Sequence, residues 1–409
     1  MKRDFLIHSA ALLVLLCVSC ATLEAQKFER LALTPPMGWN SWNKFGCNVD
    51  ERLIRETADA MVSHGMLKAG YRYVVIDDCW QGERDSLGWI HPNPQRFPSG
   101  MKALADYVHG KGLKFGIYSC AGDQTCGGHP GSRGHEYQDA LSYAQWGVDY
   151  LKYDWCNTTG LNAAGAYTTM RDALHAAGRP VVFSVCEWGD NQPWLWGKDV
   201  GHLWRTTGDI TPCFDCEVNH GSWSSWGIMK VVEMRKSIRQ YAGPDHWNDP
   251  DMLEVGNGMS VNEDRAHFSL WCMMAAPLIA GNDIRTINAS TAEILANPEV
   301  IAIDQDSLGV QGFRFTTTPD GIEVWAKPLV RGDWALCLLN RSERTRTVEI
   351  NWREYALNDD ISKQGLDPGT FSYAIRDLWK QQMMGTTRET LRAAIPSRDV
   401  AMLRLTKQH

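Results

Sequence analysis

One pattern recurs through the first three hundred positions: a short apolar run that ends in polar residues, followed in most cases by an amphipathic stretch. Runs rich in β-branched and aromatic residues predict strands. We expect eight of them, at residues 36–39, 73–78, 114–119, 149–155, 181–187, 202–209, 246–251 and 278–283. Strands that alternate with helices form parallel sheets, and eight such repeats predict a (β/α)8 TIM barrel of the α/β class.

Helical periodicity appears between most of these strands. Apolar residues at helical spacing predict helices at residues 50–64, 136–146, 163–177, 225–241 and 262–274. The fifth repeat is short, because only residues 188–208 separate Glu187 from Asp209. Its helix should therefore be a stub around residues 193–197.

The pattern changes after about residue 305. Short β runs broken by Gly, Pro, Asn or Asp occur at 312–317, 321–328, 333–340, 345–350, 373–378, 382–386 and 400–405. This spacing predicts a C-terminal antiparallel β-sandwich domain. We therefore expect a signal peptide at 1–25, a catalytic barrel at 26–305 and a β domain at 306–409. No long Pro/Ser-rich linker separates the last two, so they should be docked together.

The N-terminus has the features of a targeting segment. Lys2 and Arg3 precede an apolar run over 10–18 that is too short to span a membrane. This arrangement predicts a secretory signal peptide, with cleavage after Ala25. Lipidation at Cys20 is the alternative. We expect an exported protein without a transmembrane segment, either periplasmic, secreted or anchored as a lipoprotein through Cys20, and the short signal suggests a bacterial origin.

An exported chain can form disulfides. Twelve cysteines minus the two in the signal peptide leave ten. Cys47 and Cys79 could pair, and so could Cys126 and Cys156, although connectivity does not follow from sequence.

Cys213 and Cys216 form a CxxC pair. A zinc site there would need two further ligands, for which Cys120 and Cys186 are conceivable. A local disulfide or free thiols is the favoured interpretation.

Polar side chains gather where the predicted strands end, which in such barrels is where the active site lies. The set comprises seven carboxylates, two cations and two aromatic residues: Trp39, Asp77, Asp78, Tyr118, Lys152, Asp154, Glu187, Arg205, Asp209, Asp251 and Asp283. A single aspartate could simply cap the next helix. Because like charges this close raise each other's pKa, the whole set indicates a functional site.

Two chemistries suit such a rim. A metal site would favour histidine ligands, but His202 and His246 begin their strands and should lie at the opposite end. Glycoside hydrolysis needs one carboxylate nucleophile and one carboxylic acid. Lys152 shares the face of Asp154 and should keep it ionised, whereas Asp209, among other acids, could have a raised pKa.

The composition agrees with a sugar-binding enzyme better than with a nucleic-acid binder. The net charge is −7 and no basic stripe is visible. The 18 Trp residues include Trp39 at a strand end, where an indole could face a sugar ring.

Seven ordered segments carry a family resemblance: TPPMGWNSW (34–42), VIDDCW (75–80), KFGIYS (114–119), YLKYD (150–154), CEWG (186–189), WRTTGDI (204–210) and WNDPDM (247–252). They resemble the retaining α-galactosidases of glycoside hydrolase family 27. The tail, with VWAKPL (324–329) and DLW (377–379), resembles that family's C-terminal β domain.

The resemblance implies a role for each site residue. Asp154 matches the nucleophile and Asp209 the acid/base. The substrate contacts that it implies are Trp39 as the platform beside the sugar, Asp77 and Asp78 at the galactose 4- and 6-hydroxyls, Glu187 at the 2-hydroxyl, and Tyr118, Lys152, Arg205 and Asp251. It also implies Cys47–Cys79 and Cys126–Cys156 disulfides and neither metal nor organic cofactor.

The expected activity is exo-acting release of terminal α-linked galactose, and the expected partner is an α-galactoside. Glu187 and the Asp77–Asp78 pair favour galactose over the alternatives, α-N-acetylgalactosaminides and β-L-arabinopyranosides. A sugar-binding protein without catalysis is a third interpretation, which the presence of both catalytic carboxylates disfavours. The chain departs from the family at Cys120, at the unpartnered Cys186 and at the extra Cys213–Cys216 pair.

Overall fold

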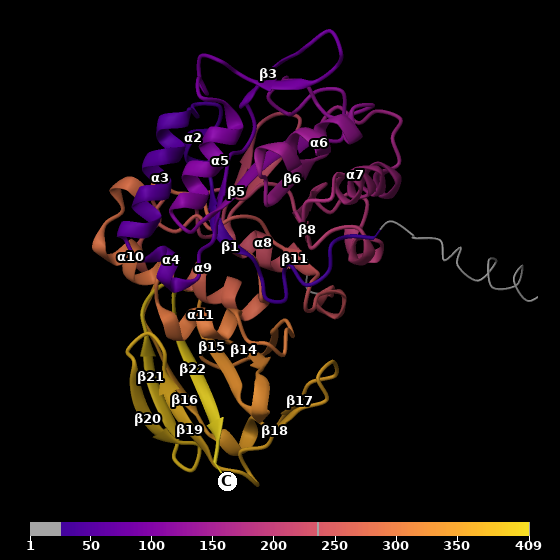
Figure 1. Ribbon diagram of the computed structural model, residues 1–409. Helices are drawn as coiled ribbons and strands as arrows, with labels where there is room; N and C mark the ends of the chain where they lie inside the picture. The colour runs from indigo at the N-terminus through magenta and orange to yellow at the C-terminus, as the bar shows by residue number, and fades with distance from the viewer. Residues whose placement is uncertain (1–25, 235–236, 409) are drawn as a thin grey trace, which may run out of the picture.

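The computed structural model describes residues 26–234 and 237–408, so the predicted signal peptide and Cys20 lie outside the described residues. Eight parallel strands form the barrel (Figure 1): β1 (Met37–Asn40), β2 (Tyr73–Val75), β5 (Lys114–Cys120), β6 (Tyr150–Asp154), β7 (Val182–Cys186), β8 (Leu203–Arg205), β11 (Trp247–Asp249) and β12 (Leu278–Ala280). Every predicted strand is confirmed.

The strand order follows the chain, β11-β8-β7-β6-β5-β2-β1-β12. The ring closes through Leu253, just beyond β11, which bridges to β12. Its N–H donates to Ile279 O at 2.8 Å, and its carbonyl accepts from Gly281 N at 3.0 Å. The predicted (β/α)8 barrel is therefore confirmed, with all strand carboxyl ends at one rim.

Helices surround the sheet. The longer ones are α3 (Glu51–Ser63), α5 (Gly100–Gly110), α6 (Glu136–Trp146), α7 (Ala163–Ala177) and α9 (Val261–Met274), and the shorter ones are α2 (Trp42–Phe45), α4 (Met66–Ala69), α10 (Ala289–Leu295) and α11 (Pro298–Asp304). Side chains define where several begin: Asp50 accepts from Leu53 N at 2.7 Å, and Ser260 with Glu263 forms a capping box. The fifth repeat has only the 3-10 turns Pro193–Leu195 and Gly197–Asp199, as its shortness predicts.

The helix predicted at residues 225–241 is confirmed only in part. Residues Ser224–Trp226 form a strand, β10, which pairs with β9 (Glu217–Asn219) in a hairpin. The helix α8 is shorter, Ile228–Met234, and Arg239–Tyr241 is a 3-10 turn. Backbone pairing across the hairpin overrides the helical spacing of its side chains, which is only a local signal. A second hairpin that the sequence did not reveal joins β3 (Gln81–Arg84) to β4 (Ile90–Pro92).

The C-terminal part is the predicted antiparallel sandwich and lies below the barrel in Figure 1. Its six-stranded sheet contains β13 (Phe313–Thr317), β14 (Ile322–Pro328), β15 (Trp334–Asn340), β22 (Asp399–Lys407), β19 (Tyr373–Asp377) and β20 (Gln382–Thr386). Shorter pairs are β16 (Arg346–Ile350) with β21 (Leu391–Ile395), and β17 (Leu357–Asn358) with β18 (Gly365–Leu366).

The two parts share a buried interface. The Lys327 ammonium, almost fully buried on β14, donates to two carbonyl oxygens of the barrel helices, Cys272 O at 2.9 Å and Ile303 O at 2.7 Å. Trp379 donates from Nε1 to Ser269 Oγ on α9 at 2.9 Å. The sandwich is therefore docked rather than tethered.

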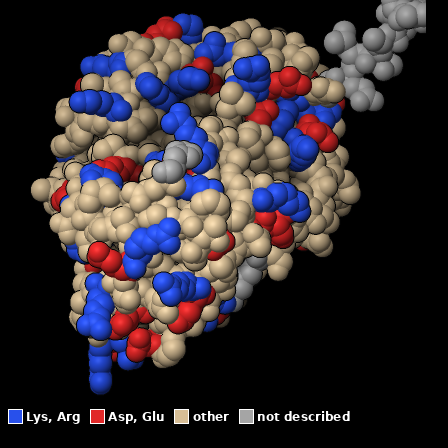
Figure 2. Space-filling model, turned by 90° about the horizontal axis from the view of Figure 1, so that it is seen from below, with Lys and Arg blue, Asp and Glu red and all other residues tan. Residues whose placement is uncertain are grey.

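The surface carries interleaved charges. On the face seen in Figure 2, acidic and basic side chains alternate rather than gathering into a stripe of one sign. Within the described residues, no helix has the length and apolar character that crossing a bilayer requires.

Candidate active site

The carboxyl ends of the central strands bring the predicted polar side chains together. Along neighbouring strands the register aligns Tyr118 with Lys152 and Lys152 with Ser184. Asp249 on β11 lies opposite Arg205 on β8. A small cavity at this rim is lined by Lys152, Arg205, Asp249 and other barrel residues.

A buried ion pair holds Asp77. Lys152 Nζ donates to Asp77 Oδ2 at 2.8 Å, and Asn40 Nδ2 donates to the same oxygen at 2.7 Å. The Lys152 ammonium also lies 5.4 Å from the Tyr118 ring centroid. Asp77 is therefore a charge-paired carboxylate on one side of the rim.

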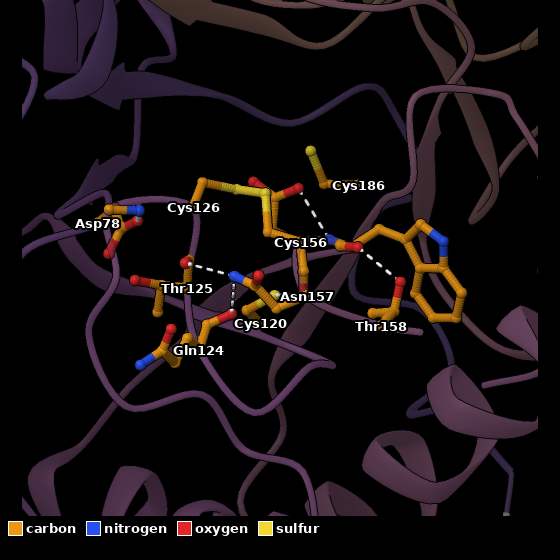
Figure 3. Close-up of a disulfide and its surroundings, with 12 residues drawn as sticks. Asp78, Cys120, Gln124, Thr125, Cys126, Cys156, Asn157, Thr158 and Cys186 are labelled. Atoms are coloured by element: carbon orange, nitrogen blue, oxygen red, sulfur yellow. Dashed lines mark hydrogen bonds between the residues drawn. A yellow bond between two sulfur atoms is a disulfide. The ribbon is translucent and has the colours of Figure 1, made fainter. Parts of the chain in front are cut away.

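The neighbouring Asp78 is held in place by a hydrogen bond from a loop that a disulfide anchors. Its Oδ2 accepts from Gly127 N at 2.7 Å, and burial raises its pKa. A Cβ at Gly127 would approach that carboxylate oxygen to 3.1 Å, so only glycine fits without displacement. The adjacent Cys126 is bonded to Cys156, which joins the loops that follow β5 and β6 near Asp78 (Figure 3).

The other disulfide that the resemblance implies, Cys47–Cys79, is also present. Of the zinc site, local disulfide and free thiols considered for the CxxC pair, the structure has the local disulfide between Cys213 and Cys216. Cys120 and Cys186 are buried free thiols.

Asp154 ends β6 and is only 5% exposed. Its Oδ1 accepts from Trp155 N at 2.8 Å, and a carboxylate oxygen lies within 4.8 Å of both sulfurs of the Cys126–Cys156 disulfide. Burial raises its pKa to about 6, the Lys152 charge lowers it, and the Asp209 charge raises it further. Lys152 therefore favours the ionised form of Asp154, as expected, although the pKa is raised overall because desolvation outweighs the effect of an ammonium that is paired with Asp77.

Arg205 gathers two acids on the opposite side. Its Nη2 lies 2.9 Å from Asp209 Oδ1 and 2.9 Å from Asp251 Oδ2. The same Asp251 oxygen accepts from Ile210 N at 2.8 Å. Asp251 has a φ of 85°, a strained conformation for a residue with a side chain, of the kind that clusters at functional sites. The Asp209 side chain is 38% exposed, so the two proposed catalytic acids differ sharply in solvent access.

Three other predicted strand-end residues have surroundings unlike those of the paired acids above: two are fully buried and one caps a turn. Glu187 is fully buried: its Oε2 accepts from Asn191 N and Nδ2 at 2.6 and 2.8 Å, no described residue donates to its Oε1, and burial raises its pKa to about 7. Trp39 is also fully buried and donates from Nε1 to Asn282 O at 2.7 Å. Asp283 caps the Ile284–Thr286 turn and pairs with Arg285 at 2.8 Å, so its role is the helix-capping one.

Sequence reasoning missed Asp249. It is buried at the end of β11, its Oδ1 accepts from Asp251 N at 2.9 Å, and burial raises its pKa to about 6. Asp249 lies in the WNDPDM segment, two residues before Asp251. An acid in a short buried strand was the signal that could have identified it.

The described residues contain two His, Cys, Asp or Glu groups compact enough for a metal ion: Cys47, Cys79 and His129, and Cys126, Asp154 and Cys156. Each contains a disulfide, whose sulfurs are not thiolate ligands. The arrangement instead suits acid–base and nucleophilic chemistry, because one carboxylate, Asp154, is buried and another, Asp209, is partly exposed.

Known proteins share both parts of the chain. Residues 34–306 match the family described as alpha galactosidase A, and residues 319–405 match the alpha galactosidase C-terminal beta sandwich domain. The alpha-galactosidase A of Cellvibrio japonicus is 58% identical over 381 residues, covering 93% of this chain and 94% of the relative.

Two solved structures agree. The α-galactosidase I of Mortierella vinacea has a TM-score of 0.84 and 38% identity, covering 92% of this chain and 98% of that one. The Saccharomyces cerevisiae α-galactosidase solved with raffinose has a TM-score of 0.85 and 32% identity, with the same two coverages.

Proposed function

The chain belongs to the alpha galactosidase A family, and on that premise we propose that it is an exo-acting, retaining α-galactosidase. It hydrolyses terminal α-linked D-galactose from oligosaccharides, polysaccharides or glycoconjugates. The observation that carries the assignment of roles is the contrast between Asp154, buried at the end of β6, and Asp209, which is partly exposed to solvent and paired with Arg205.

In the first step the Asp154 carboxylate attacks the anomeric carbon while Asp209 donates its proton to the leaving oxygen. The glycosidic bond breaks, and a galactosyl ester of Asp154 forms. In the second step Asp209 takes a proton from water, the water oxygen attacks the same carbon, and the ester bond breaks. Two displacements at one carbon release α-galactose with retained configuration and restore both carboxyl groups.

A nucleophile should be unprotonated and poorly solvated, whereas the acid needs access to the leaving group and then to water. The 5% exposure of Asp154 and its electrostatic neighbour Lys152 suit the first role. The 38% exposure of the Asp209 side chain suits the second.

The remaining rim residues are proposed to bind galactose. Asp77 and Asp78 would accept hydrogen bonds from the 4- and 6-hydroxyls, and Lys152, Arg205, Tyr118 and Asp251 would contact the ring substituents. The unpartnered, buried Glu187 Oε1 is free to accept from the 2-hydroxyl. The fully buried Trp39 would form the apolar floor of the site. A carboxylate at the 2-position leaves no room for an acetamide, which favours galactose over N-acetylgalactosamine.

Proton NMR on 4-nitrophenyl α-D-galactoside tests the function. Early α-galactose is expected, and early β-galactose would contradict a retaining mechanism.

Azide rescue separates the two roles. In Asp154→Ala, azide should displace the leaving group directly and yield β-galactosyl azide. In Asp209→Ala, it should attack the galactosyl ester and yield the α-azide. Exchanged anomers would exchange the roles of the two residues.

We further propose export. Disulfides are typical of extracellular or secreted proteins, and three are present in the described residues. A cleaved signal peptide at 1–25 in a bacterial cell, with a periplasmic, secreted or Cys20-anchored product, remains our proposal. The matched ranges support a barrel at 26–305 and a sandwich at 306–409.

A further inference from the structure

The exposed indole of Trp223 stands on a hairpin whose base is bonded to the proposed acid/base residue. The second strand of the hairpin ends at Trp226, which donates from its backbone N–H to Asp209 O at 2.9 Å and accepts from Thr211 N at 2.9 Å. A Cβ at Gly208 would lie 3.1 Å from Trp226 Nε1, so this side chain packs directly against the residue before Asp209.

The hairpin tip carries an aromatic platform, defined here as His220 and Trp223. The two rings stack with centroids 4.0 Å apart and 21° between their planes. His220 Nε2 lies 3.0 Å from Ser225 Oγ, and its backbone N–H donates to Trp223 O at 2.9 Å. Trp223 is nevertheless 51% exposed. Because the imidazole covers one face of the indole, the exposed area includes the opposite face.

The hairpin is anchored at its base. The Cys213–Cys216 disulfide closes the loop between Asp209 and the hairpin. Phe214 in that loop is buried, with the Arg398 guanidinium 5.6 Å from its ring. Asp215 pairs with Arg341 of the sandwich at 3.3 Å. An exposed apolar ring on an anchored hairpin loses little conformational freedom when it binds a ligand.

A general acid must sit beside the leaving oxygen, so the leaving group begins at Asp209. Trp223 directly precedes β10 and lies three residues along the chain from Trp226, a reach of about 10 Å at the rise per residue of a strand. That reach exceeds one pyranose ring. A flat apolar face at that distance has the chemistry that binds a sugar ring by stacking.

From this continuity we infer that the platform is a binding site for the leaving-group sugars of an oligosaccharide, beyond the first sugar after the scissile bond. The inference rests on the proposed α-galactosidase activity. The platform would make the enzyme selective for galactosides with extended leaving groups. Trp223 is a specificity-determining residue in this scheme, and the stacked His220 is a positioning residue that holds its orientation.

The test compares two substrates that share the galactosyl group. α-Galactosyl fluoride has no leaving-group sugar, whereas raffinose has two. For Trp223→Ala, the ratio of kcat/KM on raffinose to kcat/KM on the fluoride should fall roughly fivefold or more, mainly through KM on raffinose. Trp223→Phe keeps a flat ring and should retain most of the wild-type ratio. Phe371→Ala, which removes another exposed aromatic ring from the sandwich, should leave the ratio unchanged.

An unchanged ratio in Trp223→Ala would overturn the inference, as would an equal loss on both substrates, which would indicate only support of Asp209. Sedimentation velocity tests whether the platform instead binds a second copy of the chain. A change of oligomeric state in Trp223→Ala, with an unchanged ratio, would assign the platform to self-association. A wild-type protein inactive on α-galactosyl fluoride would instead overturn the proposed function itself.

Discussion

Replacing Asp154 by Asn should stabilise the folded protein at neutral pH. Burial raises the pKa of Asp154 from 3.8 to about 6. The folded state therefore binds the proton more tightly than the unfolded state, and the ionised carboxylate opposes folding. The opposition is absent below pH 3.8, grows as the pH rises through the window to about 6, and is complete above it.

The difference of about 2 pKa units corresponds to ~3 kcal/mol at 1.36 kcal/mol per unit. The amide introduced by Asp154→Asn would keep an oxygen to accept from Trp155 N, although a neutral amide accepts a weaker bond than a carboxylate. We therefore expect D154N to gain about 1–3 kcal/mol at pH 7.5, which for a chain of this size raises Tm by about 1–4 °C. At pH 4.0 most of the gain should disappear.

The assay is thermal unfolding of both proteins by differential scanning calorimetry at pH 7.5 and 4.0. Asp139→Asn is the matched control, because Asp139 is also buried but accepts both of its 2.7 Å bonds from Arg84. Breaking that pair should destabilise the protein by about 3 kcal/mol. A D154N variant less stable than wild type at pH 7.5, or a difference equal at the two pH values, would refute the reasoning.

Three further outcomes are expected. The acid limb of kcat/KM should lie near pH 6, because Asp154 must be ionised to attack, and a limb near pH 4 in the pH–rate profile would contradict its burial. Lys327→Met leaves two barrel carbonyls without their donor and should lower the free energy of unfolding in urea by about 2 kcal/mol; the exposed Lys380→Met is the control, and equal losses would contradict the interface role. Cys126→Ala with Cys156→Ala should lose about 3 kcal/mol in the same assay, together with activity, since their loop holds Asp78; full activity would show that the loop keeps its place unaided.

Local patterns predicted the elements well where one period dominated. The helices at 136–146 and 163–177 have the bounds of α6 and α7, since in each of them the buried residues recur at helical spacing. The prediction for 225–241 was wrong at its start, where cross-strand bonds between Ser224–Trp226 and Glu217–Asn219 set the conformation. Such bonds join residues several positions apart, which helical periodicity does not detect.

The candidate site shows the same division. Strand alternation indicated that Lys152 and Asp154 lie on one side of their strand. It could not show that the Lys152 ammonium pairs with Asp77 rather than Asp154, or that Arg205 contacts Asp209 and Asp251 together. Those choices depend on contacts across strands far apart in the chain.

The sequence by itself determined the alternation of strands and helices, the sandwich that follows, and the gathering of carboxylates at one rim, because these depend on side-chain periods of two and 3.6 residues. Only the tertiary structure decided which carboxylate is desolvated and which is open, that Asp283 caps a turn while Asp249 enters the site, and that a hairpin is bonded to Asp209. Burial and charge pairing depend on distances in space, and those exist only after the barrel has closed.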